Sequence, residues 1–485
     1  MADQPHIVLY VSDSLRADHL SCYGYDRETT PQVDRLAADG VRFDHAFAQA
    51  YKTVESSVSI VTGLYPPAHG ARTTYDAIPA DAPSLAETLA AAGYRTAGFS
   101  SLVQLSERRG FDRGFETFQE LFRTHRIDDG VTDWAAVCTD RAIEWLEGHR
   151  GGERPLFLFV WSNGTHDPYA PRAGEFADPD HPVDGSLKSL RAADADDAAR
   201  VRDLYDDTIR HADAEFGRLC SYLRESGLYD ETAIVFTADH GELLSEHGRL
   251  QHAYRPVKRL VSRLAPAVVR SKTLFDPGAF VGHLGVLPYE ELLHVPMIIK
   301  PPGRTHAGER RSGLVETVDL APTIADLAGA SVGSRAPPRD SQGPSFDTQG
   351  TSLRPLLAAD RAFKEYVYSD TAISRGLTQS RSVRSADHKL VRTDWAPARL
   401  RSREALEATN AALSVLQKTT GPTELCFALP DEDRPIGDEE PAIRRKLADE
   451  LDEWLLDSER RSLESSVTEL DDETVSQLQE LGYMS

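Results

Sequence analysis

The chain has 485 residues, enough for one large domain and a smaller one, because single cores stop growing beyond roughly 250 to 300 residues. Its 77 acidic and 54 basic residues give a formal charge of −23. This balance argues against nucleic acid as the main partner, since that affinity comes chiefly from Lys and Arg that neutralise phosphates. The acidic, lysine-poor composition predicts a halophilic source, with an ordinary acidic bacterial enzyme as the alternative.

The N-terminal region and the cysteines indicate the compartment. The apolar run HIVLYVSD, residues 6–13, has no basic segment before it and is too short to span a bilayer. No later segment is typical of a membrane span, so a cytoplasmic protein is predicted. The cysteines are far apart, without a CxxC pair, and predict reduced thiols rather than a zinc site or a disulfide framework. They are Cys22, Cys138, Cys220 and Cys426.

The first elements in chain order are a strand and a helix. HIVLYVSD is rich in β-branched residues, the pattern of a buried strand. The segment 30–40 predicts a helix with Thr30 as N-cap, Pro31 at the first helical position and Gly40 as the stop.

Similar helix and strand patterns then alternate along the chain. They lie at residues 84–93, 94–101, 139–149, 155–164, about 194–227, 232–241 and 295–303. Strands that alternate with helices predict a large, mostly parallel sheet covered by helices on both faces. The fold class is therefore α/β.

The composition changes after residue 330. The segment 331–350 is rich in Ser, Gly and Pro and predicts a linker or a long loop. Beyond it, EYVYSD (365–370) and SVRSADHKLVRTD (382–394) resemble antiparallel strands, and a helix is expected near 440–456. We therefore expect a catalytic domain over 1–330 and a smaller α+β subdomain over 351–485.

Polar residues at the ends of the predicted strands are the candidates for chemistry. In open α/β sheets, ligands bind beyond the carboxyl ends of the strands. Asp13, His166 and the pair Asp239 and His240 follow three such strands, and Thr53 lies in a turn that could join them. Two carboxylates, a neutral imidazole and a hydroxyl can bind one divalent cation, which would also activate the hydroxyl. A helix entered at about Glu55 would direct backbone N–H groups toward Thr53.

Each of these residues has a structural alternative when it is taken singly. Asp13 could cap a strand end, Thr53 could be an ordinary loop residue, and Asp239 with His240 could be surface polar. Several ligand-type residues at strand ends of one sheet are harder to explain in that way.

Four motifs together resemble the sulfatase family of the alkaline phosphatase superfamily. They are VSDSLRADHLSCYGYDRETTPQVDRLAADGVRFDHAFAQ, SIVTGLYPPAHG, THDPYAP and FTADHGELLSEHG. Their order and spacing carry the resemblance through almost the whole chain. It implies a metal-dependent ester hydrolase with Thr53 as nucleophile, and with Asp13, Thr53, Asp239 and His240 at the metal.

The chain departs from the family pattern at the nucleophile. Family sulfatases carry a C-x-P-S-R motif whose cysteine is oxidised to formylglycine. Counting along the motif places Thr53 at that cysteine, so no formylglycine is expected, with Glu55 at the Pro and Ser57 at the Arg. The first motif usually has two adjacent aspartates, whereas this chain has Asp13 followed by Ser14, so one implied ligand is missing.

Threonine at position 53 changes the expected reaction. A formylglycine hydrate can expel sulfate by collapsing to the aldehyde, but a threonine ester must be attacked by water or another acceptor. The loop is similar to that of phospho-acting relatives with a Thr nucleophile, such as nucleotide pyrophosphatases, lipoteichoic acid synthases and phosphoethanolamine transferases. Phosphoester hydrolysis or phosphoryl-group transfer is therefore expected at least as strongly as sulfate hydrolysis. A non-catalytic homologue that only binds anions is the alternative.

The resemblance also implies two histidines at the substrate. His166 and, by a looser match, His283 would contact the ester or protonate the leaving group. A His ligand favours Mn²⁺ or Zn²⁺ over Ca²⁺, but Asp-His pairs also occur in calcium-dependent family members, and Mg²⁺ stays open as well. The expected substrate is an anionic ester, either a small molecule or one linked to a glycan or lipid. The sequence leaves the oligomeric state open.

A basic insertion is expected over residues 249–280. It carries seven Lys and Arg side chains between residues 249 and 272, and no acidic residue occurs in that span. The spacing of its apolar residues predicts a basic amphipathic helix. It could pack on the acidic body, or it could form a lid or an anion-recruiting surface beside the site.

Overall fold

The computed structural model describes most of the chain. The described residues are 4–124, 133–193, 195–244, 246, 281–282, 287–333, 345–373, 378–395, 423–430, 432, 434–436, 440–464, 468 and 475. No helix among them is long and apolar enough to cross a membrane. The expected basic insertion, 249–280, and His283 lie outside the described residues.

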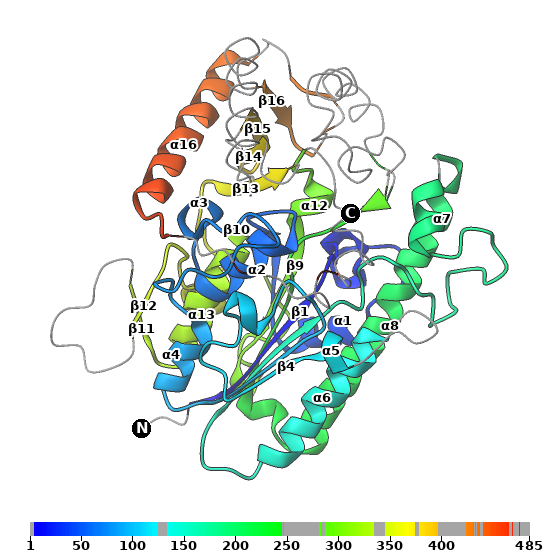
Figure 1. The fold of residues 1–485 in the computed structure, drawn as a ribbon, viewed down its shortest axis with the longest axis vertical. Coiled ribbons are helices and arrows are strands. Elements are labelled where there is room, and N and C mark those ends of the chain that lie inside the picture. The colour runs from blue at the N-terminus through cyan, green and yellow to red at the C-terminus, as the bar shows by residue number, and fades with distance from the viewer. Residues whose placement is uncertain are drawn as a thin grey trace.

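The centre of the molecule is an eight-stranded sheet (Figure 1). Its strands, in spatial order, are β10 (Glu309–Glu316), β2 (Val41–Phe47), β9 (His294–Lys300), β6 (Thr232–Ala238), β1 (His6–Ser12), β5 (Leu156–Ser162), β3 (Arg95–Ser100) and β4 (Thr117–Glu120). Only β9 runs antiparallel to its neighbours in this sheet. The three central strands β6, β1 and β5 are parallel and almost completely buried, as their unbroken apolar runs predict.

Helices cover both faces of the sheet, so the predicted α/β class is confirmed (Figure 1). One face carries α1 (Pro31–Asp39), α6 (Trp134–His149) and α8 (Ala198–Glu225). The other carries α2 (Thr53–Thr62), α4 (Leu85–Ala91) and α13 (Leu320–Leu327). Shorter helices are α3 (Pro66–His69), α5 (Leu121–Thr124), α7 (Leu187–Ala192), α12 (Glu290–Leu293) and α14 (Arg354–Ala358).

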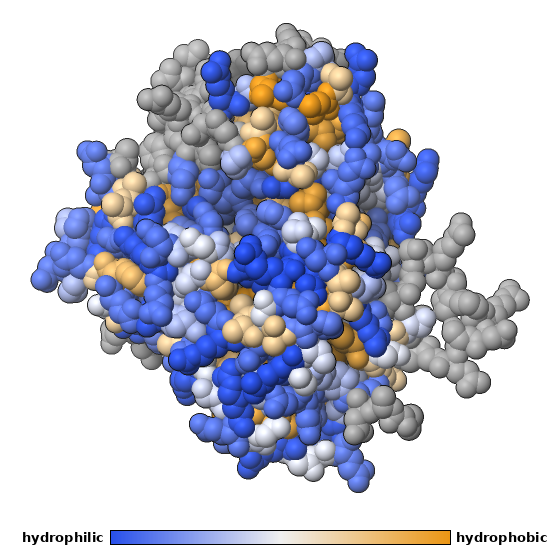
Figure 2. Space-filling model, turned by 180° about the vertical axis from the view of Figure 1, so that it is seen from behind, coloured by the Kyte–Doolittle hydropathy of each residue, from blue (hydrophilic) through white to orange (hydrophobic). Residues whose placement is uncertain are grey.

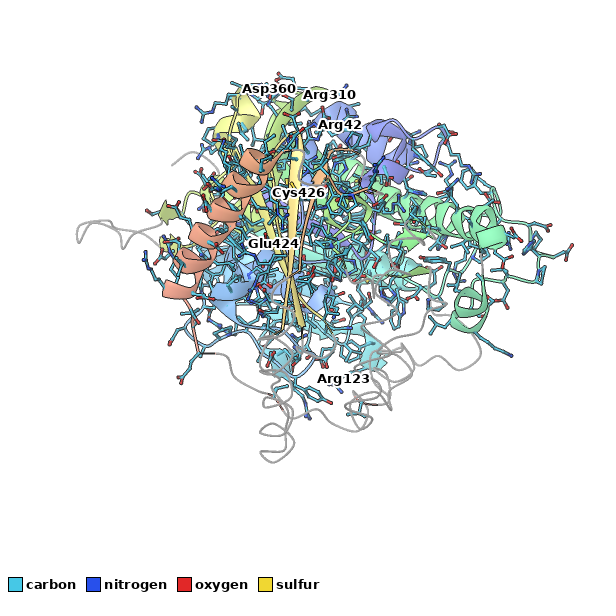
Figure 3. The ribbon with its side chains drawn as sticks, turned by 90° about the horizontal axis from the view of Figure 1, so that it is seen from above. Arg42, Arg123, Arg310, Asp360, Glu424 and Cys426 are labelled. Carbon is cyan, nitrogen blue, oxygen red and sulfur yellow. The ribbon has the colours of Figure 1, made fainter. Side chains whose placement is uncertain are left out.

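The smaller C-terminal part is an antiparallel sheet with one long helix. It contains β13 (Val367–Ile373), β14 (Thr378–Arg384), β15 (His388–Trp395) and β16 (Thr423–Ala428), in that spatial order, and α16 (Pro441–Arg460). Figure 3 shows α16 lying along this sheet, with Glu424 and Cys426 on the last strand. Its apolar side chains form a second, smaller core that includes Leu451 and Trp454. This α+β part was also predicted.

Two strand pairs complete the described structure. β7 (Leu243–Leu244) pairs with β8 (Val281–Gly282), and β11 (Ser331–Gly333) pairs with β12 (Ser345–Asp347). The last two strands lie at the ends of the segment for which the sequence predicted a linker or long loop.

The cap of α1 differs from the prediction. The helix begins at Pro31, but the Thr30 side chain makes no capping hydrogen bond. Instead, the carboxylate of Asp213 on α8 accepts hydrogen bonds from the amides of Gln32 and Val33, at 2.9 and 2.8 Å. A side chain about 180 residues away therefore satisfies the amides that a local cap would have served.

Charged side chains are concentrated on the surface. Figure 2 shows that the described part of one face is mostly hydrophilic, with apolar side chains in small groups. Arg42 and Arg310, labelled in Figure 3, lie on neighbouring strands, and both donate to the carboxylate of Asp44. Leu456 is the single large apolar side chain that is exposed among the described residues.

Candidate active site

Three strands end at the same level of the sheet and bring the candidate residues together. Ser12, the last residue of β1, pairs with Ala238 of β6 on one side and with Ser162 of β5 on the other. Asp13 and Asp239 follow these ends directly, and the loop after β5 carries His166. All three side chains are buried.

Asp13 is held by donors on both carboxylate oxygens. The hydroxyl of Ser14 donates to Oδ1 at 2.9 Å, and the indole N–H of Trp161 donates to Oδ2 at 3.2 Å. The Thr165 hydroxyl donates to the backbone carbonyl of Asp13. These contacts fix the direction in which the carboxylate faces.

Ser14 replaces the second aspartate of the family motif without replacing its charge. Its backbone has a φ of 59°, in the left-handed region, which is unusual for a residue other than Gly, Asn or Asp. Its amide donates to Oδ1 of Asp239 at 3.0 Å, and its carbonyl accepts a hydrogen bond from Tyr205 at 2.7 Å. Ser14 therefore links the two carboxylates through its backbone and side chain.

Asp239 is fully buried and only partly supplied with donors. Oδ1 accepts from the amides of Ser14 and His240, whereas Oδ2 takes no hydrogen bond from a described residue and lies 3.3 Å from His240 Nε2. Burial raises the pKa of Asp239 to about 7, although the two amides lower it. A cation at Oδ2 would offset the cost of burying this charge.

Nε2 is the ring nitrogen of His240 that faces Oδ2 of Asp239. Its Nδ1 lies 2.8 Å from the carbonyl of Gly241, which can only accept, so Nδ1 carries the proton. In the neutral ring, Nε2 then keeps the lone pair that a metal requires. Gly241 is needed here because a Cβ would lie 1.9 Å from the carbonyl oxygen of Glu291.

Thr53 is the first residue of α2, although the sequence suggested that the helix is entered near Glu55. Its side chain is 2% exposed, and Oγ1 lies 3.3 Å from His240 Nε2. The first amides of a helix have no acceptor within the helix and mark the positive end of its dipole. The hydroxyl therefore lies between a potential metal ligand and an end of α2 that favours anions.

The two neighbouring serines of α2 are bound within the protein. Ser56 donates to the carbonyl of Asp239 at 2.6 Å, and Ser57 donates to the carbonyl of Val54 at 3.2 Å. Ser57, at the place of the family's Arg, supplies no positive charge. Glu55 is fully buried, and burial raises its pKa to about 7.

Among the described histidines of this site, His166 has a raised pKa. Its Nδ1 lies 2.5 Å from the carbonyl oxygen of Asp167 and 2.7 Å from the Oδ1 of its carboxylate. Burial lowers the pKa of His166, but Asp167, with further contributions from Asp13 and Glu242, raises it well above the usual value. The imidazolium form is therefore favoured, and its charge acts on Asp239 as well.

Sequence reasoning missed residues that support the site. Glu242 is fully buried, and burial raises its pKa to about 8, with Asp167 raising it further and His166 and His240 lowering it. Its place directly after the Asp-His-Gly motif could have revealed it. Trp161, which donates to Asp13, could have been suspected because it lies near the end of a predicted strand. Tyr205, which donates to Ser14, lies in the middle of a long helix, where no sequence pattern marks it as part of the site.

The donor set can hold a divalent cation. One ligand atom each from Asp13, Asp239 and His240 lies within 4.8 Å of the others, and all three residues are buried. Carboxylate oxygens with one imidazole suit Mn²⁺, Zn²⁺, Mg²⁺ or Ca²⁺. Oδ2 of Asp239 accepts no backbone amide from a described residue and faces His240 Nε2, which agrees with a cation at this place.

Comparisons with known proteins agree with these motifs. A family model described as Sulfatase matches residues 5–330, and one described as N-sulphoglucosamine sulphohydrolase, C-terminal, matches residues 286–395. The chain is 24% identical to an N-acetylglucosamine-6-O-sulfatase of Bacteroides thetaiotaomicron, over 80% of this chain and 78% of the relative. It is also 24% identical to the multifunctional alkaline phosphatase superfamily protein PehA of Trinickia caryophylli, over 73% and 77%.

Solved structures show the same fold. The crystal structure of the phosphonate monoester hydrolase of Agrobacterium radiobacter superposes with a TM-score of 0.65 over 94% of this chain and 96% of that one. The sequence identity is 18%.

Proposed function

Because the chain belongs to the sulfatase family, we propose that it cleaves a sulfate or phosphate ester, with Thr53 as nucleophile and one divalent cation at Asp13, Asp239 and His240. The observation that carries this proposal is the convergence of these three buried ligand atoms within 4.8 Å of one another, with the Thr53 hydroxyl 3.3 Å from His240 Nε2. The bound cation would supply Lewis acidity to the ester and to the attacking hydroxyl.

The chain's own residues account for the other steps. The hydroxyl of Thr53 gives its proton to solvent, Oγ1 attacks the sulfur or phosphorus atom, the bond to the leaving oxygen breaks, and the sulfuryl or phosphoryl group is transferred to threonine. His166 is favoured in its protonated form, so it can give a proton to that oxygen. Both contacts of His166 with Asp167 use Nδ1, so the transferred proton would come from Nε2. Water or another acceptor then releases the group from Thr53.

Threonine favours the phospho-type reaction. A threonine ester has no second hydroxyl with which to collapse to an aldehyde, and no formylglycine is expected. Phosphoester hydrolysis or phosphoryl-group transfer therefore stands beside sulfate hydrolysis. The relatives support both outcomes, since one is named a sulfatase and another is solved as a phosphonate monoester hydrolase. The proposed substrate is an anionic ester, small or linked to a glycan or lipid.

A substrate and metal screen tests the proposal. Aryl sulfate, phosphate monoester and phosphodiester substrates would each be assayed with Mn²⁺, Zn²⁺, Mg²⁺ and Ca²⁺. In Thr53→Ala, we expect a rate loss of roughly a thousandfold, about 4 kcal/mol of transition-state stabilisation, with metal still bound. Thr53→Ser should retain part of the rate because it keeps a hydroxyl. Rapid quench and peptide mass spectrometry should find the adduct on Thr53.

The result that would contradict this assignment is a Thr53→Ala protein that turns over its substrate at the wild-type rate. Ser56 would then be the next candidate, although it already donates to the Asp239 carbonyl. Thr53→Cys should not create a formylglycine sulfatase, because Glu55 and Ser57 stand where the modifying motif has Pro and Arg.

A non-catalytic anion-binding protein is the second candidate. Two substitutions favour it, since Ser14 brings no second aspartate and Ser57 brings no guanidinium. In this case sulfate or phosphate should bind to the metal-loaded protein, as calorimetry would measure, while every ester in the screen stays intact.

A further inference from the structure

The edge strand of the C-terminal sheet is docked on the segment that carries Thr53. In the described part of the chain, β13 has β14 on one side, and its other edge faces the large domain. Three alternate amides along that edge donate to groups of the large domain. Tyr368 donates to Glu316 Oε1 at 2.9 Å, Asp370 to the Gln49 carbonyl at 2.8 Å, and Ala372 to Glu55 Oε1 at 2.9 Å.

The two side chains that contact Ala372 belong to residues on either side of Thr53 in the sequence. Glu55 accepts from the Ala372 amide, and the ammonium of Lys52 donates to the Ala372 carbonyl at 2.5 Å. The N–H and C=O of one strand residue point to the same side, so both side chains grip the same edge position. Lys52 directly precedes Thr53, and Glu55 follows it by two residues. A third contact, from the Tyr51 amide to the Thr371 hydroxyl at 3.2 Å, continues the same docking.

The contact between Glu55 and Ala372 is buried, and the contact between Lys52 and Ala372 is partly buried. Glu55 is fully buried, Ala372 is 1% exposed and Thr53 is 2% exposed. A buried donor that loses its acceptor pays its desolvation cost, so such contacts resist displacement. The first turn of α2 is therefore fixed by a strand more than 300 residues later, and not only by its own helix.

Glu55 also marks a difference from the family motif. That motif has Pro at this place, and the Pro side chain has no acceptor atom, so it could not bind the Ala372 amide. The carboxylate here replaces a stiff residue with a contact to another sheet.

We propose that Glu55 and Lys52 are positioning residues that hold the Thr53 hydroxyl at the metal ligands by anchoring the first turn of α2 to β13. This rests on the proposed role of Thr53. Neither side chain needs to touch the substrate. Their effect on rate follows from geometry, since misplacing a reacting group by about 1 Å can cost roughly a hundredfold.

The experiment uses the full-length, metal-loaded protein and the best ester from the screen. Glu55→Leu and Lys52→Met each remove one contact to Ala372, whereas Glu55→Gln keeps an acceptor oxygen. Glu365→Leu is the matched control, because that carboxylate lies at the surface and contacts Lys446. The readouts are kcat, KM, bound metal, and hydrogen exchange of the peptide that contains Ala372.

In Glu55→Leu and Lys52→Met, we expect kcat to fall at least about tenfold while KM stays within about twofold, since substrate binding is not removed. Metal content should be unchanged, and the Ala372 peptide should exchange faster. Glu55→Gln should recover most of the rate and of the protection, and Glu365→Leu should match the wild type in every readout.

Two results would overturn the proposal. One is faster exchange at Ala372 with an unchanged kcat, which would make the contact purely structural. The other is a lower kcat with unchanged exchange, which would mean that Glu55 acts by another route. If Glu55→Leu does not fold, Lys52→Met decides by the same criteria. A Thr53→Ala protein with full activity would refute the nucleophile itself, whatever these variants show.

Discussion

Two groups of buried carboxylates in this molecule differ in how their oxygens are used. On α8, Asp206 is bound by side chains, with His19 Nδ1 and the Tyr25 hydroxyl both at 2.7 Å. The next residue, Asp207, accepts from three consecutive loop amides at 2.7 to 3.0 Å.

At the carboxyl ends of the strands, Asp239 has two amides on Oδ1 and no described donor on Oδ2. Asp206 and Asp207 are thus held by scaffold donors, whereas Oδ2 of Asp239 faces Nε2 of His240, 3.3 Å away. The number of donors alone does not mark a metal ligand, because Asp13 accepts on both of its carboxylate oxygens. What Asp13 and Asp239 share is their place beside His240, with one ligand atom from each of the three residues within 4.8 Å of the others.

The largest effect that separates the two groups is expected at Asp239. Asp239→Asn keeps the size and an acceptor for the amides of Ser14 and His240, but it removes the charge that a cation needs. We expect loss of stoichiometric metal and a rate loss of roughly a thousandfold or more, with little change in thermal unfolding of the metal-free protein. Metal analysis and steady-state kinetics measure this, and chelation should reproduce it in the wild type. Full activity of the variant would refute the proposed metal site, and so would wild-type activity that does not respond to chelators.

The opposite result is expected for a scaffold carboxylate. Asp213→Ala leaves the amides of Gln32 and Val33 without their acceptor at the start of α1. We expect a loss of about 1–3 kcal/mol in the free energy of unfolding, with normal metal content and normal activity for each folded molecule. Denaturant unfolding and metal analysis test this. Loss of metal in this variant would erase the distinction between the two groups.

The pH dependence of the reaction should reveal the effect of Asp167 on the pKa of His166. Burial lowers the pKa of His166, but Asp167, together with Asp13 and Glu242, raises it well above its usual value. The charged imidazole therefore stabilises the fold at low pH, and this contribution is lost as pH rises through the raised pKa. Activity that needs protonated His166 should fall over the same interval. In Asp167→Asn, we expect this alkaline limb of kcat to move to lower pH by about one unit or more. An unmoved limb would exclude His166 as the acid.

The smallest expected effect concerns the basic insertion. If its side chains raise the local concentration of an anionic substrate, replacing Arg255, Lys258, Arg259 and Arg263 with Gln should lower kcat/KM several-fold at low salt and change kcat less. The difference should vanish near 1 M salt, where the Debye length is about 3 Å. Equal kinetics at low salt would favour a purely structural role.

The sequence predicted those features that depend on nearby residues. Apolar runs located the central strands, and the rule for strand ends identified Asp13, Asp239 and His240, which the structure places together. Thr30 stands at the predicted N-cap position, but its side chain makes no capping hydrogen bond, and Asp213, remote in sequence, accepts from the first amides instead. For the same reason no local pattern could show that Glu55 binds Ala372. The roles of Thr53, His166 and His283, and the domain limits, stay predictions.

The docking of β13 also has a consequence for aggregation. A sheet edge with unpaired N–H and C=O groups is a template on which another chain can add a strand. Here the outward amides of residues 368, 370 and 372 are occupied by the large domain, and Trp454 of α16 packs edge-on against Tyr65 at a ring distance of 5.3 Å. If residues 351–485 were produced alone, both the edge and this aromatic surface would be uncovered. Copies of such a fragment should associate through their exposed strand edges. In the full chain, the large domain covers this edge and so prevents that association.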